Sequence, residues 1–199
     1  MYRSNEDRTE HSASFHQALY QRLMSHAVKE DPNAGFLAEM IASWIAGEGA
    51  LPRFMGLEKD AYDAMLETFF PGMSPLDAGD RNDIEPERGP ELEDVKALLL
   101  THRNNSTDAE LWVAQIVASG CMGSDHLWSD LGLFSRKNLG IMLKHNFTAL
   151  AVLNDKNMRW KKFFYRQLCA KEGFIMCRSP SCETCSEYKA CFAEDGMFD

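Results

Sequence analysis

A dense run of cysteines near the end of the chain limits what this sequence can fold into more than any other feature. Cys177, Cys182, Cys185 and Cys191 lie within 15 residues, with the spacing C-x4-C-x2-C-x5-C. Thiols this close together in sequence point to disulfides, to zinc or to an iron–sulfur cluster. The chain begins with the polar run MYRSNEDR, without an apolar segment, so we expect no secretory signal, a cytoplasmic location and reduced thiols.

The spacing favours an iron–sulfur cluster over zinc. Structural zinc sites with four cysteines usually pair two short C-x2-C segments across a longer loop. This run has one such pair, Cys182 and Cys185, with a single cysteine on either side. Thiolates are the soft, anionic donors that iron–sulfur clusters use, and the outer cysteines can reach around a cubane. We therefore predict a cluster of the 4Fe–4S type on the four cysteines, with zinc as the alternative.

The composition excludes several classes of partner. The chain of 199 residues has 21 lysines and arginines against 30 acids, a formal net charge of −9. Such an acidic chain is a poor ligand for nucleic acid or for an anionic membrane, and no apolar run approaches the roughly 18 residues of a membrane span. We expect neither partner. The sequence also contains nothing like a catalytic triad, a P-loop or a dinucleotide motif, so we expect no enzyme.

Helical periodicity dominates the chain and predicts an all-α fold. Apolar residues recur every three or four positions, and no sustained alternation of the kind found in strands is present. We expect about seven or eight helices in a bundle-like domain, followed by a cysteine-rich metal-binding loop. The expected helices cover residues 14–31, 35–47, 58–70, 91–101, 107–120, 135–147 and 154–171.

Shifts in composition divide the chain into five parts. We expect residues 1–13 to be disordered and residues 14–70 to form a first helical part. Residues 71–90 contain four prolines and many acids, which predicts a long loop and a hinge. A second helical part covers 91–173, and the cysteine-rich, cluster-binding tail covers 174–199.

The last expected helix carries a concentration of positive charge. Arg159, Lys162 and Arg166 recur at spacings of three and four residues, so they share one helix face. One interpretation is a solvated face whose cations favour the helix dipole. The other is an anion site or a partner-docking surface beside the cysteine run, and the sequence leaves both open.

Three further residues are of types that commonly serve as metal ligands. Cys169 precedes the cysteine run by eight residues, and Cys121 and His126 lie at either end of a glycine-containing stretch. Free cysteines are often buried, so we read these residues first as structural and second as candidate additional ligands. The single histidines His102 and His145 are interpreted as structural.

The run WKKFFYRQLC at 160–169, joined to the cysteine spacing that follows it, resembles the nitrogen-fixation family NifQ. The run HLWSDLGL at 126–133 is similar to the middle section of that family. The resemblance covers residues 90–195 well and the N-terminal helices loosely.

The resemblance implies a protein that handles molybdenum. Members of this family carry a molybdenum–iron–sulfur cluster and are taken to donate molybdenum for the iron–molybdenum cofactor of nitrogenase. The implied partners are the scaffold complex on which that cofactor is built, the nitrogenase iron protein, and molybdate as the source. By position, Cys177, Cys182, Cys185 and Cys191 match the cysteine motif of the family.

Two alternatives belong to other functional classes. The spacing C-x2-C-x5-C also resembles the cluster loop of all-α base-excision DNA glycosylases, although their first spacer has six residues instead of four. That family needs a basic DNA-binding face and a hairpin lysine or aspartate motif, which we do not find, and the acidic charge opposes DNA binding. The third interpretation is a zinc-stabilised interaction module without a redox role.

Overall fold

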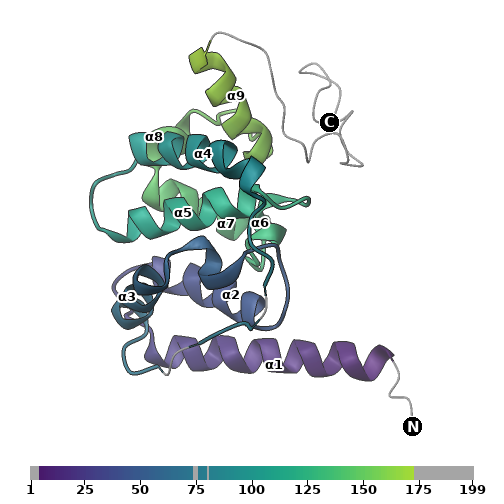
Figure 1. The fold of residues 1–199 in the computed structure, drawn as a ribbon. Helices are drawn as coiled ribbons and strands as arrows, with labels where there is room; N and C mark the ends of the chain where they lie inside the picture. Colours follow the sequence, from purple (N-terminus) through teal and green to yellow (C-terminus); the bar gives the residue numbers. More distant parts are fainter. Residues whose placement is uncertain (1–4, 74–75, 80, 173–199) are drawn as a thin grey trace.

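The structure is a computed structural model that describes residues 5–73, 76–79 and 81–172, and within that part it confirms the all-α prediction (Figure 1). Two of its nine described α-helices have five residues or fewer, which explains the difference from the expected number. None of the described helices combines the length and the apolar character needed to cross a membrane. The α-helices are α1 (Asn5–His26), α2 (Asn33–Ile45), α3 (Lys59–Phe69), α4 (Gly89–Thr101), α5 (Ala109–Cys121), α6 (Leu127–Asp130), α7 (Arg136–Asn146), α8 (Thr148–Val152) and α9 (Trp160–Glu172), and the short 3-10 helices are η1 (Arg53–Gly56) and η2 (Pro86–Arg88).

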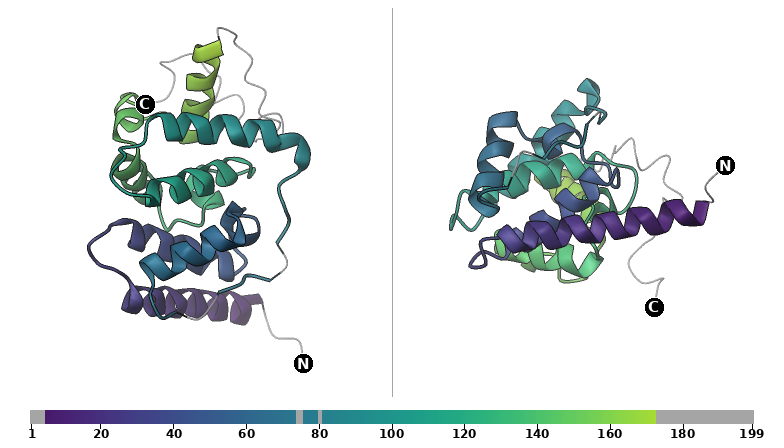
Figure 2. Two further views of the ribbon diagram at one scale, coloured as in Figure 1. Left: turned by 60° about the vertical axis from the view of Figure 1, so that its left-hand side comes forward. Right: turned by 90° about the horizontal axis from the view of Figure 1, so that it is seen from below.

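The helices are stacked, with α1 at one end of the molecule and α9 at the other (Figures 1 and 2). Helices α1 to α3 make up the first half, in which α1 packs along α2. Helices α4 to α9 make up the second half, in which α4 packs against both α5 and α9. The halves meet where α2 contacts α7 and where α3 contacts α5.

A hydrophobic core runs through both halves. In the first half Trp44 and Tyr62 are fully buried, and the Trp44 indole N–H donates to the carbonyl of Pro52 at 2.9 Å. In the second half Phe163 and Phe164 of α9 bury their rings in the same core. Burial of each large apolar side chain contributes roughly 1.5–3 kcal/mol, so the two phenylalanine rings stabilise the packing of α9 on the rest of the molecule.

Five helices begin and end within two residues of the prediction: α2, α3, α4, α5 and α7. Their apolar stripes are clear in the sequence, and local polar contacts mark the starts of two of them, α7 and α5. At the start of α7 the Ser135 side chain accepts a hydrogen bond from the N–H of Asn138 at 3.1 Å, which is ordinary N-cap geometry. At the start of α5 the buried carboxylate of Glu110 accepts from the backbone N–H groups of Asn105 (2.8 Å) and Ser106 (2.9 Å).

The first and last helices begin at other residues than predicted. Helix α1 starts at Asn5 instead of residue 14, in a polar stretch where no apolar periodicity could reveal it. Helix α9 starts at Trp160 instead of residue 154. The Asn154 side chain accepts from the N–H of Met158 (2.8 Å) and donates to its carbonyl (3.0 Å), so it closes a loop and does not cap a helix. Within that loop Asn157 has φ +50°, a left-handed conformation that interrupts a helix.

The connection between α3 and α4 is held against the body. The Tyr62 hydroxyl donates to the carbonyl of Leu76 at 3.0 Å. The Arg81 guanidinium donates to the carbonyls of Trp44 (2.6 Å) and Glu48 (2.9 Å) at the end of α2. These contacts attach described parts of the connection to the first half, and the hinge expected at residues 71–90 stays a prediction.

Candidate functional site

The four cysteines that we predict as metal ligands, Cys177, Cys182, Cys185 and Cys191, lie outside the described residues. The structure does describe the helix that leads to them, because α9 ends at Glu172, five residues before the first cysteine. The site can therefore be built from α9 and from the elements on which it packs.

One side of α9 is aromatic and fixes the helix on the body. The Trp160 ring lies 5.7 Å from the ring centroid of Phe163 and 5.8 Å from that of Phe164. Both phenylalanines are buried, and Leu168 packs against the same core from the following turn. The spacing of these residues follows the helical period, which explains why this segment folds as an amphipathic helix.

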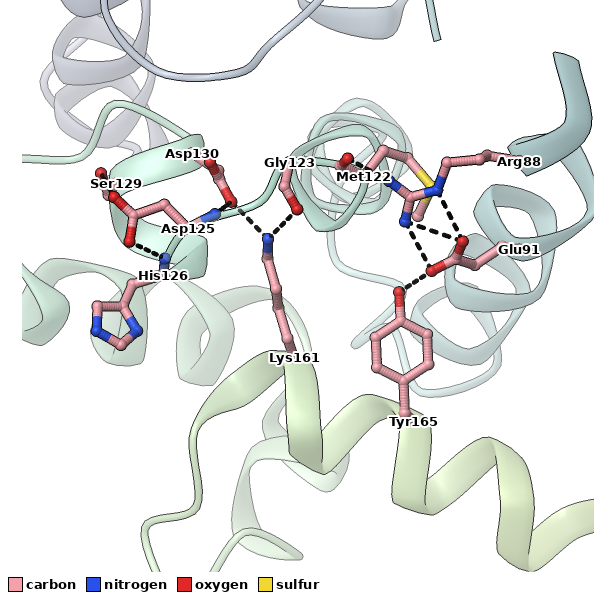
Figure 3. A network of polar contacts seen from close by, with 10 residues as sticks. All are labelled: Arg88, Glu91, Met122, Gly123, Asp125, His126, Ser129, Asp130, Lys161 and Tyr165. Atoms are coloured by element: carbon pink, nitrogen blue, oxygen red, sulfur yellow. Dashed lines mark hydrogen bonds and ion pairs between the residues drawn. The ribbon is translucent and has the colours of Figure 1, made fainter. Parts of the chain in front are cut away.

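A buried ion pair joins the first turn of α9 to α6 (Figure 3). The Lys161 ammonium contacts the Asp130 carboxylate at 2.5 Å and donates to the carbonyl of Gly123 at 2.8 Å. The same carboxylate accepts from the backbone N–H of Asp125 at 3.0 Å. The Asp130 side chain is 6% exposed and that of Lys161 is 17% exposed. Burial raises the pKa of the Asp130 carboxyl, and the Lys161 ammonium opposes that rise.

Gly123 leaves the space that this ion pair occupies. A Cβ atom at this position would lie 2.3 Å from the carboxyl carbon of Asp130, well inside van der Waals contact. Any larger residue would displace the carboxylate from Lys161. The glycine is therefore required by the close approach of Asp130.

A second polar contact, one turn further along α9, reaches α4 (Figure 3). The Tyr165 hydroxyl donates to the Glu91 carboxylate, which also receives two hydrogen bonds of 2.9 Å from Arg88. Arg88 in turn donates to the carbonyl of Met122. Lys161 and Tyr165 are four residues apart and so lie on the same helix face. We call the Lys161–Asp130 and Tyr165–Glu91 contacts, with Arg88, the α9 clamp.

The α9 clamp was missed by the sequence reasoning, and its position shows why. In the sequence Lys161 is one of several cations around the start of this helix, and only the fold shows that its ammonium faces the body. Its carboxylate partner lies 31 residues earlier and that of Tyr165 lies 74 residues earlier, so no local pattern connects them. The i, i+4 spacing of Lys161 and Tyr165 was the available signal.

The three candidate additional ligands are in different environments. Cys121 is fully buried beside the clamp, and burial raises the pKa of its thiol to about 12. His126 is exposed and precedes α6, where its backbone N–H donates to the Asp125 carboxylate at 2.7 Å. Cys169 is half-buried on α9. Among the described residues no three histidine, cysteine or acidic side chains gather as a metal site, so a ligand role for these residues stays a prediction.

The three cations of the predicted basic face do not share one environment. Arg159 lies just before α9, where its carbonyl accepts from the N–H of Phe163 at 2.9 Å, and it is half-buried like Lys162. Arg166 is exposed, with its guanidinium 3.7 Å from the sulfur of Met158. The fold adds a cation from another helix, since Arg136 of α7 donates to the carbonyl of Asn157 at 3.2 Å. The role of this group in binding an anion or a partner stays a prediction.

Comparison with known proteins decides the family. The NifQ family model matches residues 36–193, which include the α9 clamp and all four cysteines. The chain belongs to the NifQ family. It is 42% identical to Protein NifQ of Azotobacter vinelandii over 183 residues, or 86% of this chain and 94% of that protein.

Other NifQ proteins match over most of their length as well. Protein NifQ of Rhodobacter capsulatus is 42% identical over 80% of this chain and 87% of its own. Protein NifQ of Klebsiella pneumoniae is 35% identical over 81% of this chain and 99% of its own. No solved structure matches the chain. The Nif name places these relatives in nitrogen fixation, and the predicted family is confirmed.

Proposed function

We propose that this NifQ-family chain carries a molybdenum–iron–sulfur cluster on Cys177, Cys182, Cys185 and Cys191 and donates its molybdenum for the iron–molybdenum cofactor of nitrogenase. The observation that carries the proposal is the C-x4-C-x2-C-x5-C spacing inside residues 36–193, the stretch that matches the family. In this proposal the chain works in the cytoplasm as a carrier, and molybdenum is its cargo.

The donor set fits such a cluster. Four thiolates from one short segment are soft, anionic ligands, matched to iron and to sulfide-bridged metals. When bound, the cluster supplies the sulfide bridges that hold molybdenum. The chain supplies the terminal thiolate ligands and the fixed helix from which they extend.

The α9 clamp supports the proposal because it gives the tail a defined origin. Lys161 and Tyr165 attach α9 to α6 and α4, and the aromatic side of the helix is buried in the core. A carrier must present its cargo in a reproducible position, and a helix fixed by a buried ion pair and by apolar packing meets that need better than a free linker.

Molybdate and two proteins complete the proposal. Molybdate is a dianion, and Arg159, Lys162 and Arg166 place positive charge on and just before the helix that leads to the thiolates, which would raise its local concentration. The receiving proteins are the cofactor scaffold complex and the nitrogenase iron protein. Neither role needs a catalytic group in this chain.

Metal analysis of anaerobically purified protein tests the ligand assignment. We expect iron, molybdenum and visible charge-transfer absorption in the parent protein, and a sharp loss of all three when any one of the four cysteines is replaced by alanine. Cys169→Ala is measured beside them, because it tests the candidate additional ligand: unchanged metal content would assign Cys169 a structural role, and a loss would add it to the ligands. Full iron in all four single variants would show that these cysteines are not the ligands.

The metal found also separates the alternatives. Zinc in place of iron would favour the zinc-stabilised interaction module. Iron without molybdenum, together with DNA binding, would favour the glycosylase-like reading. Donation is then measured in a mixture of scaffold complex and iron protein to which no free molybdate is added, where the parent should support cofactor assembly and the cysteine variants should not.

A further inference from the structure

Exposed apolar side chains are concentrated on α7 and α8. Six large apolar side chains are strongly exposed in the described residues, and three of them are Ile141 (47%), Val152 (64%) and Leu153 (53%). An isolated exposed apolar residue is ordinary, but three on or directly after two adjoining helices call for an explanation.

These residues lie on, or directly after, two helices that pack against each other. On α7 the exposed side chains Lys137, Ile141 and Lys144 follow one another at spacings of four and three residues, so they share a side of the helix. Helix α8 starts two residues after α7 ends and packs against it, with the Thr148 hydroxyl donating to the carbonyl of Lys144 at 2.8 Å. Val152 and Leu153 then follow at its end. We call this group the α7–α8 face.

The stretch of chain that forms this face and α9 is basic, although two acids of the first half approach α7: Glu39 accepts from the Asn138 amide at 2.7 Å, and Asp31 lies 3.5 Å from His145. Residues 131–170 contain one acid, Asp155, although the whole chain has a formal net charge of −9. Lys161 pairs with Asp130 and Arg136 donates to the carbonyl of Asn157, and the remaining cations are distributed over α7, the loop before α9, and α9. The lysines and arginines of this stretch are Arg136, Lys137, Lys144, Lys156, Arg159, Lys161, Lys162 and Arg166.

We propose that the α7–α8 face docks an acidic surface of the protein that receives the molybdenum. Cations beside exposed apolar side chains match a partner surface with carboxylates around an apolar patch, and such complementarity speeds association and fixes orientation. An anionic membrane is the weaker fit, because the apolar group has no aromatic residue and the rest of the chain repels negative charge. The identity of the partner rests on the proposed function, whereas the docking face rests on the exposed residues and their charge.

Binding to two purified proteins, the cofactor scaffold complex and the nitrogenase iron protein, tests this proposal. The test variant is the double substitution Lys137→Glu with Lys144→Glu. Its matched control is Lys29→Glu with Lys59→Glu, which changes the net charge equally at two exposed lysines of the first half. A third variant, Val152→Ser with Leu153→Ser, removes apolar contacts without changing charge, and its side chains are exposed enough for the fold to persist.

We expect the parent to bind one of the two proteins, and to bind it less tightly as salt is added. The Lys137→Glu, Lys144→Glu variant should bind at least about tenfold more weakly, since it places like charges opposite each other. The apolar variant should also bind more weakly but keep the salt dependence of the parent, and the control should bind nearly as the parent does.

Three results would overturn the docking proposal: equal affinity of the parent and the Lys137→Glu, Lys144→Glu variant, an equal loss in the control, or no binding of the parent to either protein. Binding to vesicles of anionic lipid is measured in parallel. If the parent binds the vesicles and both test variants do not, the face binds a membrane and the proposal of a protein partner is wrong. Metal content is measured on the same samples. A parent protein without molybdenum would refute the proposed function, whereas the docking proposal would still be tested by the binding data.

Discussion

Removal of the Lys161 ammonium should detach α9 more than it harms the rest of the fold. In Lys161→Met the apolar stem is kept, while the Asp130 carboxylate, 6% exposed, retains the N–H of Asp125 but loses its cation. Removal of one partner of a buried ion pair costs roughly 3–5 kcal/mol. Lys161 is itself 17% exposed and Asp130 can take up a proton, so we expect a loss of about 2–3 kcal/mol in the free energy of unfolding at neutral pH.

The neighbouring lysine is the control for this experiment. Lys162→Met removes the same charge from the next position, outside the α9 clamp, and should change the free energy of unfolding by less than about 0.5 kcal/mol. Denaturant unfolding measures both values. Hydrogen exchange then locates the effect, because the amides of α9 should exchange faster in Lys161→Met while those of α2 change less.

The cost of Lys161→Met should depend on pH in a defined direction. Burial already raises the pKa of Asp130 above its usual range, and loss of the opposing ammonium raises it further. A carboxyl whose pKa is higher in the folded state destabilises the fold when it is ionised, and the destabilisation disappears as the pH falls below its unfolded value. The difference between variant and parent should therefore be full at neutral pH and shrink on acidification. The double variant Lys161→Met, Asp130→Asn should recover about half of the loss at neutral pH.

The clamp argument would be refuted by either of two results. Equal destabilisation by Lys161→Met and Lys162→Met would show that general charge matters and the buried pair does not. Unchanged exchange in α9, together with a pH-independent loss, would show that Asp130 does not depend on Lys161.

Two further predictions concern the residues around the clamp. Burial raises the pKa of the Cys121 thiol to about 12, so at pH 8 iodoacetamide should alkylate Cys121 of the native protein far more slowly than half-buried Cys169. Peptide mass spectrometry measures both rates, and comparable rates would contradict the burial of Cys121. Gly123→Ala should lower the free energy of unfolding by about 2 kcal/mol, because its Cβ would lie 2.3 Å from the Asp130 carboxyl carbon. Gly140→Ala, whose Cβ would meet nothing within 4 Å, should instead raise the free energy of unfolding by about 0.5–1 kcal/mol, since it replaces a glycine inside α7. A loss of similar size in both variants would refute the steric explanation.

Local signals in the sequence were enough to place most helices. Ser135 before α7 could be recognised as an N-cap because its function depends on residues within one turn. Asn154 has the same chemistry, yet it closes a loop with Met158, because a left-handed residue follows and the helix starts later. The residue type was informative in both cases, but only the backbone conformation tells a cap from a loop closure.

Local patterns, the cysteine spacing and the run at 160–169, predicted the ligands and the family; the family is confirmed and the ligands stay a prediction. The clamp was beyond the reach of such reasoning, since Lys161 meets a carboxylate 31 residues away and Tyr165 meets one 74 residues away. Which of the two adjacent lysines, Lys161 or Lys162, pairs with Asp130 is decided by the tertiary packing of α9. Sequence periodicity alone cannot identify the partner on the other helix.

The attachment of α9 also limits how far from the body the first cysteine of the run can lie. A helix of 13 residues is about 20 Å long, and a chain extends at most about 3.3–3.6 Å per residue beyond it. The Cα atom of Cys177, five residues after Glu172, therefore stays within about 18 Å of the end of α9. In the proposed function a recipient would have to bring its acceptor site close to the end of α9, which makes the place where it binds on this chain as important as the strength of binding.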